Sequence, residues 1–113
     1  MAAGNAGNSG AIAIPACTPG AVSVGAVYDA NVGSVSWSPC TDSTTAADKV
    51  ACFSNSANFL TLLAPGAMIT TAGMTMGGTS QASPHVAGAV ALVAQAYPAD
   101  SPDLRLSRLS GYG

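Results

Sequence analysis

Two short apolar runs mark buried strands in the hydrophobic pattern of the chain. AVSVGAV (residues 21–27) and NFLTLLAPG (residues 58–66) are almost free of polar positions, and the second ends in a Pro-Gly turn. Runs of this length predict strands that are covered on both faces. AMITTAG (residues 67–73) predicts a third, shorter strand. The pattern therefore favours a small sheet built inside a larger α/β arrangement.

The longest predicted element is a helix over about residues 80–97. Pro84 falls near its first turn, where a missing N–H costs little, and Pro98 stops it. A helix of this size is roughly 27 Å long, which is the span of a small domain. Because the segment is apolar all round, we expect it to be buried in the middle of the fold.

A second helix is predicted at the end of the chain, in the segment SPDLRLSRL. Ser101 is placed as its N-cap, Pro102 as its first residue and Asp103 in its first turn. The mixture of charged and apolar positions indicates a surface helix.

The composition argues that these elements belong to the inside of something larger. The chain has 113 residues, enough for one small domain, with 49% hydrophobic and only 7% charged residues. In an independent domain, about a quarter of all residues are charged. A net charge of −2 does not attract nucleic acid or anionic lipid. The apolar run VAGAVALVA is too short to span a membrane. We therefore expect neither a nucleic-acid partner nor a membrane.

The three cysteines are Cys17, Cys40 and Cys52, and their spacing matches no zinc-binding pattern. Cys40 and Cys52 bracket the polar segment CTDSTTAADKVAC, which is typical of a surface excursion. A disulfide that closes this segment is predicted for an oxidising compartment. The alternative is that all three are buried thiols.

The most informative residue for chemistry is Ser80, which follows two glycines at the predicted start of the long helix. A hydroxyl placed there meets unpaired N–H groups and the positive end of the helix dipole. The plainer alternative is that Thr79 or Ser80 only caps the helix. The elbow motif G-x-S-x-G is nearly matched, but Ala82 replaces its last glycine. AAGNAGN (residues 2–8) lacks the spacing G-x-G-x-x-G of dinucleotide-binding loops.

Four blocks in a fixed order resemble one family. GTSQASPHVAGAVAL resembles the nucleophile signature of the subtilisin-like serine peptidases, the subtilases, with Gln81 where a methionine is common. AAGNAGN resembles the segment that carries the oxyanion asparagine of that family. AVSVGAV and LLAPG resemble the two blocks between them, so the resemblance covers nearly the whole chain.

This resemblance implies a parallel sheet flanked by helices, with the Ser80 helix at its centre, and a serine endopeptidase that works through an acyl-enzyme. Ser80 looks like the nucleophile. The side-chain amide of Asn5 and the backbone N–H of Ser80 look like the donors to the oxyanion. Ala3 and Gly4 resemble the backbone that walls the substrate pocket. From local pattern alone, Asn5 would be interpreted as a turn asparagine.

The base and the acid of the triad are not found in this chain. The family order is Asp, His, Ser, with both partners upstream of the oxyanion asparagine. The only histidine, His85, lies about 140° around the helix from Ser80, and no acidic residue stands in an Asp-[Ser/Thr]-Gly context. We interpret His85 as a core histidine with a structural hydrogen bond. The chain is thus expected to be the C-terminal part of a subtilase catalytic domain and to be inactive alone.

The resemblance also implies partners. We expect a protein or peptide substrate, and the missing N-terminal part of the same domain. Secretion is expected for the parent protein, although the first residues show no signal-peptide pattern. No cofactor is expected; calcium occurs in the family, but no acidic cluster here supports a site. The alternative to a peptidase is a non-catalytic module of this fold that binds peptide without cleaving it.

Overall fold

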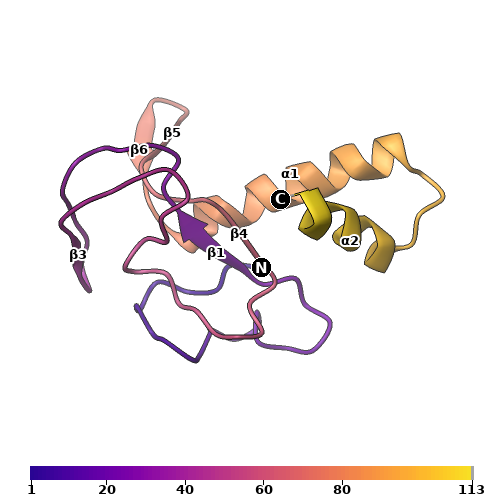
Figure 1. Ribbon diagram of the computed structural model, residues 1–113, viewed down its shortest axis with the longest axis horizontal. Helices are drawn as coiled ribbons and strands as arrows, with labels where there is room; N and C mark the ends of the chain where they lie inside the picture. Colours follow the sequence, from indigo (N-terminus) through magenta and orange to yellow (C-terminus); the bar gives the residue numbers. More distant parts are fainter. Residues whose placement is uncertain (113) are drawn as a thin grey trace.

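A pair of parallel strands lies at the centre of the protein, whose computed structural model describes residues 1–112. Strand β1 (Val24–Val27) pairs with β4 (Leu62–Pro65), with Val24 opposite Leu62 and Val27 opposite Pro65. On its other edge Val24 forms a parallel bridge to Ala2. Both predicted apolar runs therefore contain a strand, and the parallel α/β arrangement is confirmed (Figure 1).

Helix α1 (Thr79–Ala96) crosses this sheet and packs on both β1 and β4. It begins one residue earlier than predicted and contains Pro84. The expectation that it is buried on all sides is wrong for this chain. Only Thr79, Ala82 and Val86 are buried, and Leu92 is 67% exposed. The physical reason is that, among the described residues, the sheet and the segment 102–112 cover only part of the helix surface.

The helix and the sheet approach each other very closely at Gly66, the last residue of the LLAPG block. A Cβ on Gly66 would come within 2.7 Å of the Gly78 carbonyl oxygen and within 2.9 Å of the Cβ atoms of Ala26 and Ala82. The N–H of Gly78 donates to the Gly66 carbonyl at 2.7 Å. Glycine at residue 66 therefore fixes the start of α1 against the end of the sheet.

The main core lies between the sheet and the first half of α1. It consists of small and aromatic side chains that share this interface: Val24, Ala26, Tyr28, Ala51, Phe53, Ala64, Ala67, Ala82 and Val86. A second cluster, formed by Ala3, Ile12 and Ala16, lies under the N-terminal loop.

Two short hairpins extend from this core. Strand β2 (Val35–Ser36) pairs with β3 (Thr41–Asp42), and β5 (Ile69–Thr71) pairs with β6 (Met74–Met76), both antiparallel. The predicted third strand is thus β5, whereas β6 was not foreseen.

The disulfide predicted across the polar excursion is present in the structure. The sulfurs of Cys40 and Cys52 are bonded, and the bridge ties β3 to the segment that leads toward the main core. Cys17 is an exposed free thiol. The alternative of three buried thiols therefore does not describe this chain.

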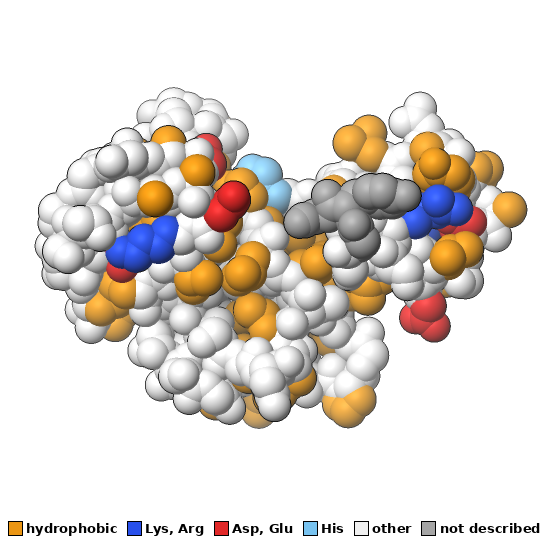
Figure 2. Space-filling model, viewed as in Figure 1, with side chains coloured by type: hydrophobic (Ala, Val, Ile, Leu, Met, Phe, Trp, Pro, Cys, Tyr) orange, Lys and Arg blue, Asp and Glu red, His pale blue; other side chains and the backbone are white. Residues whose placement is uncertain are grey.

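The second predicted helix is α2 (Pro102–Tyr112). The Ser101 hydroxyl accepts the N–H of Leu104 at 3.2 Å, which is the predicted N-cap. Helix α2 packs on α1, and the two project from the sheet (Figure 1). The radius of gyration of 14.2 Å exceeds the roughly 13 Å of a compact domain of about 100 residues. Figure 2 shows this projection as a separate lobe with apolar side chains on its surface.

Side chains near the turn between the helices hold this lobe together. The guanidinium of Arg108 lies 3.6 Å from the ring centre of Tyr97, and its Nε donates to Asp100 at 2.5 Å. Among the described residues, no helix is both long and apolar enough to cross a membrane.

Candidate active site

Ser80 is the second residue of α1, and its side chain is exposed. The N-cap is Gly78, in extended backbone, with no side-chain cap bond. The alternative that Thr79 or Ser80 merely caps the helix is therefore wrong. The backbone N–H of Ser80 has no hydrogen-bond partner among the described residues, as expected for the first turn of a helix. The site thus offers a hydroxyl and an unpaired donor on one residue.

Asn5 lies against the same helix start. Its Oδ1 accepts two hydrogen bonds from Thr79, one from the backbone N–H at 2.8 Å and one from the hydroxyl at 2.9 Å. Because the carbonyl oxygen is held in this way, the Nδ2 amide is left as the outward group of an exposed side chain. Nδ2 has no acceptor among residues 1–112. An oriented amide donor therefore stands beside the nucleophile turn.

Thr79 links the two segments that carry these groups. It is fully buried, and its hydroxyl also accepts the N–H of Gly4 at 3.0 Å. The hydroxyl thus donates to Asn5 while it accepts from Gly4. Sequence reasoning considered Thr79 only as a cap, because its partners lie more than 70 residues away.

Asn55 fixes the loop around Asn5, and sequence reasoning missed it. The side chain is 4% exposed. Its Oδ1 accepts the N–H groups of Ala6 at 3.2 Å and Asn8 at 2.9 Å, and its Nδ2 donates to the Ala3 carbonyl at 3.1 Å. The one available signal was the asparagine that ends the mostly apolar segment ACFSN (residues 51–55).

Ala3 and Gly4 lie next to the site, and only their backbone can face a substrate. The Ala3 side chain is buried against Ile12 and Ala16. Gly4 has a φ of 105°, and a Cβ there would overlap the Asn55 side chain. Glycine is therefore required for Gly4 to lie between Thr79 and Asn55.

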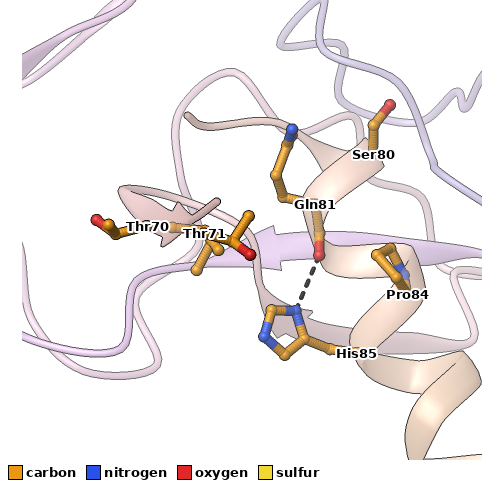
Figure 3. Close-up of a pocket in the computed structure, with 7 residues that line it drawn as sticks. Thr70, Thr71, Ser80, Gln81, Pro84 and His85 are labelled. Carbon is orange, nitrogen blue, oxygen red and sulfur yellow. Dashed lines mark hydrogen bonds between the residues drawn. The ribbon is translucent and has the colours of Figure 1, made fainter. Parts of the chain in front are cut away.

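His85 does not meet Ser80. Its Nδ1 lies 2.8 Å from the Gln81 carbonyl, which fixes the ring one turn along the helix. In Figure 3 the Ser80 hydroxyl and the imidazole point in different directions. The predicted structural hydrogen bond is present, but the prediction of a core position is wrong because His85 is exposed. The covering element that a core histidine needs is not among the described residues.

An open pocket of about 520 Å³ adjoins Ser80 on the side of α1 that faces β5. Its lining comes from the hairpin and the first turns of the helix: Ile69, Thr70, Thr71, Ser80, Gln81, Pro84 and His85. Among the described residues, no group of three or more His, Cys, Asp or Glu side chains could hold a metal ion. The polar side chains that line this pocket are three hydroxyls, one amide and one imidazole.

Residues 1–108 match the subtilase family, Peptidase_S8. Similar sequences include an extracellular serine proteinase of Thermus sp. (strain Rt41A), 38% identical over 99% of this chain and 25% of that protein. A subtilisin of Bacillus pumilus is 39% identical over 86% of this chain and 32% of that protein.

Solved structures agree with these sequence matches. A cold-adapted subtilisin-like serine proteinase has a TM-score of 0.69 and 34% identity over 96% of this chain and 35% of its own. Sphericase has a TM-score of 0.71 and 26% identity over 96% of this chain and 37% of its own. The chain thus spans between 25% and 37% of the length of these four proteins. The chain belongs to the subtilase family.

Proposed function

We propose that this chain supplies the nucleophile and the oxyanion donors of a serine endopeptidase, and that the remainder of the catalytic domain supplies the base. The observation that carries the proposal is the exposed Ser80 at the start of α1, beside an Asn5 whose carbonyl oxygen is held by Thr79. This arrangement leaves a hydroxyl, a backbone N–H and a side-chain amide free for a substrate.

The chemistry that these groups can perform is acyl transfer. The Ser80 oxygen attacks the scissile carbonyl and forms an acyl-enzyme, while a base takes its proton and later returns it to the leaving amine. The negative oxygen of the tetrahedral intermediate accepts hydrogen bonds from the Ser80 N–H and from Asn5 Nδ2. Water then hydrolyses the ester and releases the second product.

The base must come from outside the described residues. His85 is held by the Gln81 carbonyl and points away from the Ser80 hydroxyl. The open pocket between β5 and the start of α1 is a place where a segment bearing a histidine could reach Ser80. We infer that the rest of the domain, with its Asp and His, packs there and over the exposed side of α1.

The substrates proposed are proteins or peptides, and the proposed location is outside the cell. One similar protein is named an extracellular serine proteinase. The Cys40–Cys52 disulfide supports the same location, because such bonds persist in oxidising compartments.

A second candidate is a module that binds peptide without cleaving it. The observation that favours it is the lack of any base at Ser80 within the described residues. Because both candidates use the same groups, only turnover separates them.

The test uses the complete domain, meaning residues 1–113 together with the rest of the subtilase fold. We expect it to hydrolyse a chromogenic peptide, and we expect Ser80→Ala to abolish turnover. Ser83→Ala, a serine of the same helix one turn away, is the matched control. Peptide binding without turnover in the wild type would favour the binding module instead.

A further inference from the structure

The single tryptophan of the chain, Trp37, lies just before the disulfide-closed segment 40–52 and packs against the nucleophile turn at Gly77. Trp37 follows β2, and its N–H donates to the Cys40 carbonyl at 2.7 Å. Its ring meets Phe53 edge-on, with the ring centres 4.7 Å apart. Trp37 therefore joins the hairpin to the main core, although the hairpin itself lies at the surface.

The indole ring covers Gly77, the first residue of the turn that leads to Ser80. A Cβ on Gly77 would overlap the six-membered ring of Trp37. The φ of Gly77 lies outside the left-handed region, so its backbone would accept other residues. The missing side chain at residue 77 thus serves the contact with Trp37.

A buried hydrogen-bond chain fixes the edge of the indole. Trp37 Nε1 donates to the Tyr28 hydroxyl at 2.8 Å, and that hydroxyl donates to Asp42 Oδ2 at 2.7 Å. The same Asp42 oxygen accepts the N–H of Cys52 at 3.0 Å. Burial, with a smaller contribution from Asp42, raises the pKa of Tyr28 above its ordinary value of 10.0, so the phenol keeps its proton. The chain connects the disulfide to the ring over Gly77.

The turn is therefore held from two sides. On the sheet side, the Gly66 carbonyl accepts a hydrogen bond from the Gly78 N–H. On the hairpin side, the Trp37 ring packs on Gly77. The carbonyl of Gly78 in turn accepts the N–H groups of Gln81 and Ala82, at 3.1 and 3.4 Å. A shift of Gly77 would move the helix start, and with it the Ser80 hydroxyl.

We propose that Trp37 is a positioning residue for the nucleophile, and that the Cys40–Cys52 disulfide holds it in place. This inference rests on the proposed peptidase function for its kinetic consequence. The structural part of the proposal, that the indole orders residues 77–80, does not depend on peptidase activity. A misplacement of about 1 Å at a reacting group can cost roughly 100-fold in rate, so a modest loosening of the turn is measurable.

The kinetic test is a double-mutant cycle in the complete domain. Trp37→Ala should lower kcat about 10- to 100-fold with less than about a threefold change in KM, because the contact acts on the geometry of attack. Gly77→Ala should lower kcat comparably, since its Cβ displaces the indole. The double variant should be no worse than Trp37→Ala alone. Effects that multiply would overturn the proposal. Trp37→Phe, which keeps a ring over Gly77 but loses the hydrogen bond to Tyr28, should recover only part of the activity.

Controls separate positioning from a general loss of packing. Phe59→Ala removes an aromatic ring that is 54% exposed and lines a separate pocket with Cys17; it should leave kcat within about twofold. The double variant Cys40→Ser/Cys52→Ser should lower kcat in the same direction as Trp37→Ala, whereas Cys17→Ser should not.

A measurement that needs no activity distinguishes failure of this inference from failure of the proposed function. Hydrogen exchange of residues 78–82 reports the bonds to Gly66, Asn5 and Gly78. We expect exchange at least about tenfold faster in Trp37→Ala than in Phe59→Ala, measured on folded protein. Equal exchange in the two variants would overturn the proposal even if the wild type is an active peptidase. Faster exchange with an inactive wild type would support the positioning contact and refute only the peptidase.

Discussion

The Thr79 hydroxyl lies between the two segments that make the site. Its removal should therefore lower both the folding stability of the protein and its kcat. Thr79→Val keeps the approximate size of a fully buried side chain and replaces its hydroxyl with a methyl group. Two hydrogen bonds are lost: the one donated to Asn5 at 2.9 Å and the one accepted from Gly4 at 3.0 Å. Asn5 keeps the bond from the Thr79 backbone N–H.

The lost hydrogen bond to Gly4 affects mainly the folding stability, whereas the lost bond to Asn5 affects kcat. The N–H of Gly4 is left without its partner; because this donor is only partly buried, the loss costs about 1 kcal/mol of folding free energy, the lower end of the range for a buried donor. Asn5 loses one of the two bonds that orient its amide, worth about 0.5–1.5 kcal/mol. If that orientation is used in the transition state, kcat falls roughly 2- to 10-fold.

The assay is turnover of a chromogenic peptide by the complete domain at saturating substrate, with urea unfolding of the same samples. Thr79→Ser is the matched control: it loses a buried methyl, at about 1 kcal/mol of stability, but keeps the hydroxyl and therefore kcat. A Thr79→Val protein with wild-type kcat would refute the reasoning. So would a Thr79→Ser protein that loses as much kcat as Thr79→Val.

Three further outcomes are expected. Asn5→Ala should lower kcat by about 10²–10³ with little change in KM, the range known for loss of one oxyanion donor in subtilisin, and a KM defect alone would mean that Asn5 only shapes the pocket. His85→Ala should retain labelling of Ser80 by a fluorophosphonate, because the imidazole is bonded to the Gln81 carbonyl; loss of labelling in well-folded protein would contradict this. Non-reducing peptide mapping should recover Cys40 and Cys52 in one linked pair, which stabilises the fold by roughly 3 kcal/mol on the chain-entropy estimate, and two free thiols would disprove the bridge.

Local sequence signals were sufficient for the elements that depend on local chemistry. The start of α1 follows from two glycines and an early proline, and the α2 cap follows from Ser101 before Pro102. The apolar runs contain β1 and β4, although each strand is shorter than its run. These features need no knowledge of distant partners.

Elements that depend on unusual backbone or on missing neighbours were not predictable. The β5–β6 turn uses Ala72 at a φ of 50° followed by Gly73 at 77°, a conformation that alanine rarely adopts, so β6 had no turn signal. His85 and Leu92 are exposed because, among residues 1–112, the sheet and α2 cover only part of α1, and the apolar pattern of the helix cannot reveal this.

The supporting residues of the site were hidden for a different reason. Thr79 and Asn55 act through hydrogen bonds to residues 47 to 75 positions away. The residues next to a buried asparagine or threonine in the sequence do not indicate which distant group it will bind. The resemblance to the subtilase motifs predicted the roles of Ser80 and Asn5. Only the structure shows that Thr79 connects them.

The central claim is that this chain carries the nucleophile and needs its base from the rest of the domain. The most direct measurement is fluorophosphonate labelling followed by mass mapping, on residues 1–113 alone and on the same chain mixed with the remaining part of the domain. We expect negligible labelling of the chain alone, since a serine without a base keeps its proton, and rapid labelling at Ser80 in the mixture. Rapid labelling of Ser80 in the isolated chain, or labelling that survives Ser80→Ala in the mixture, would contradict it.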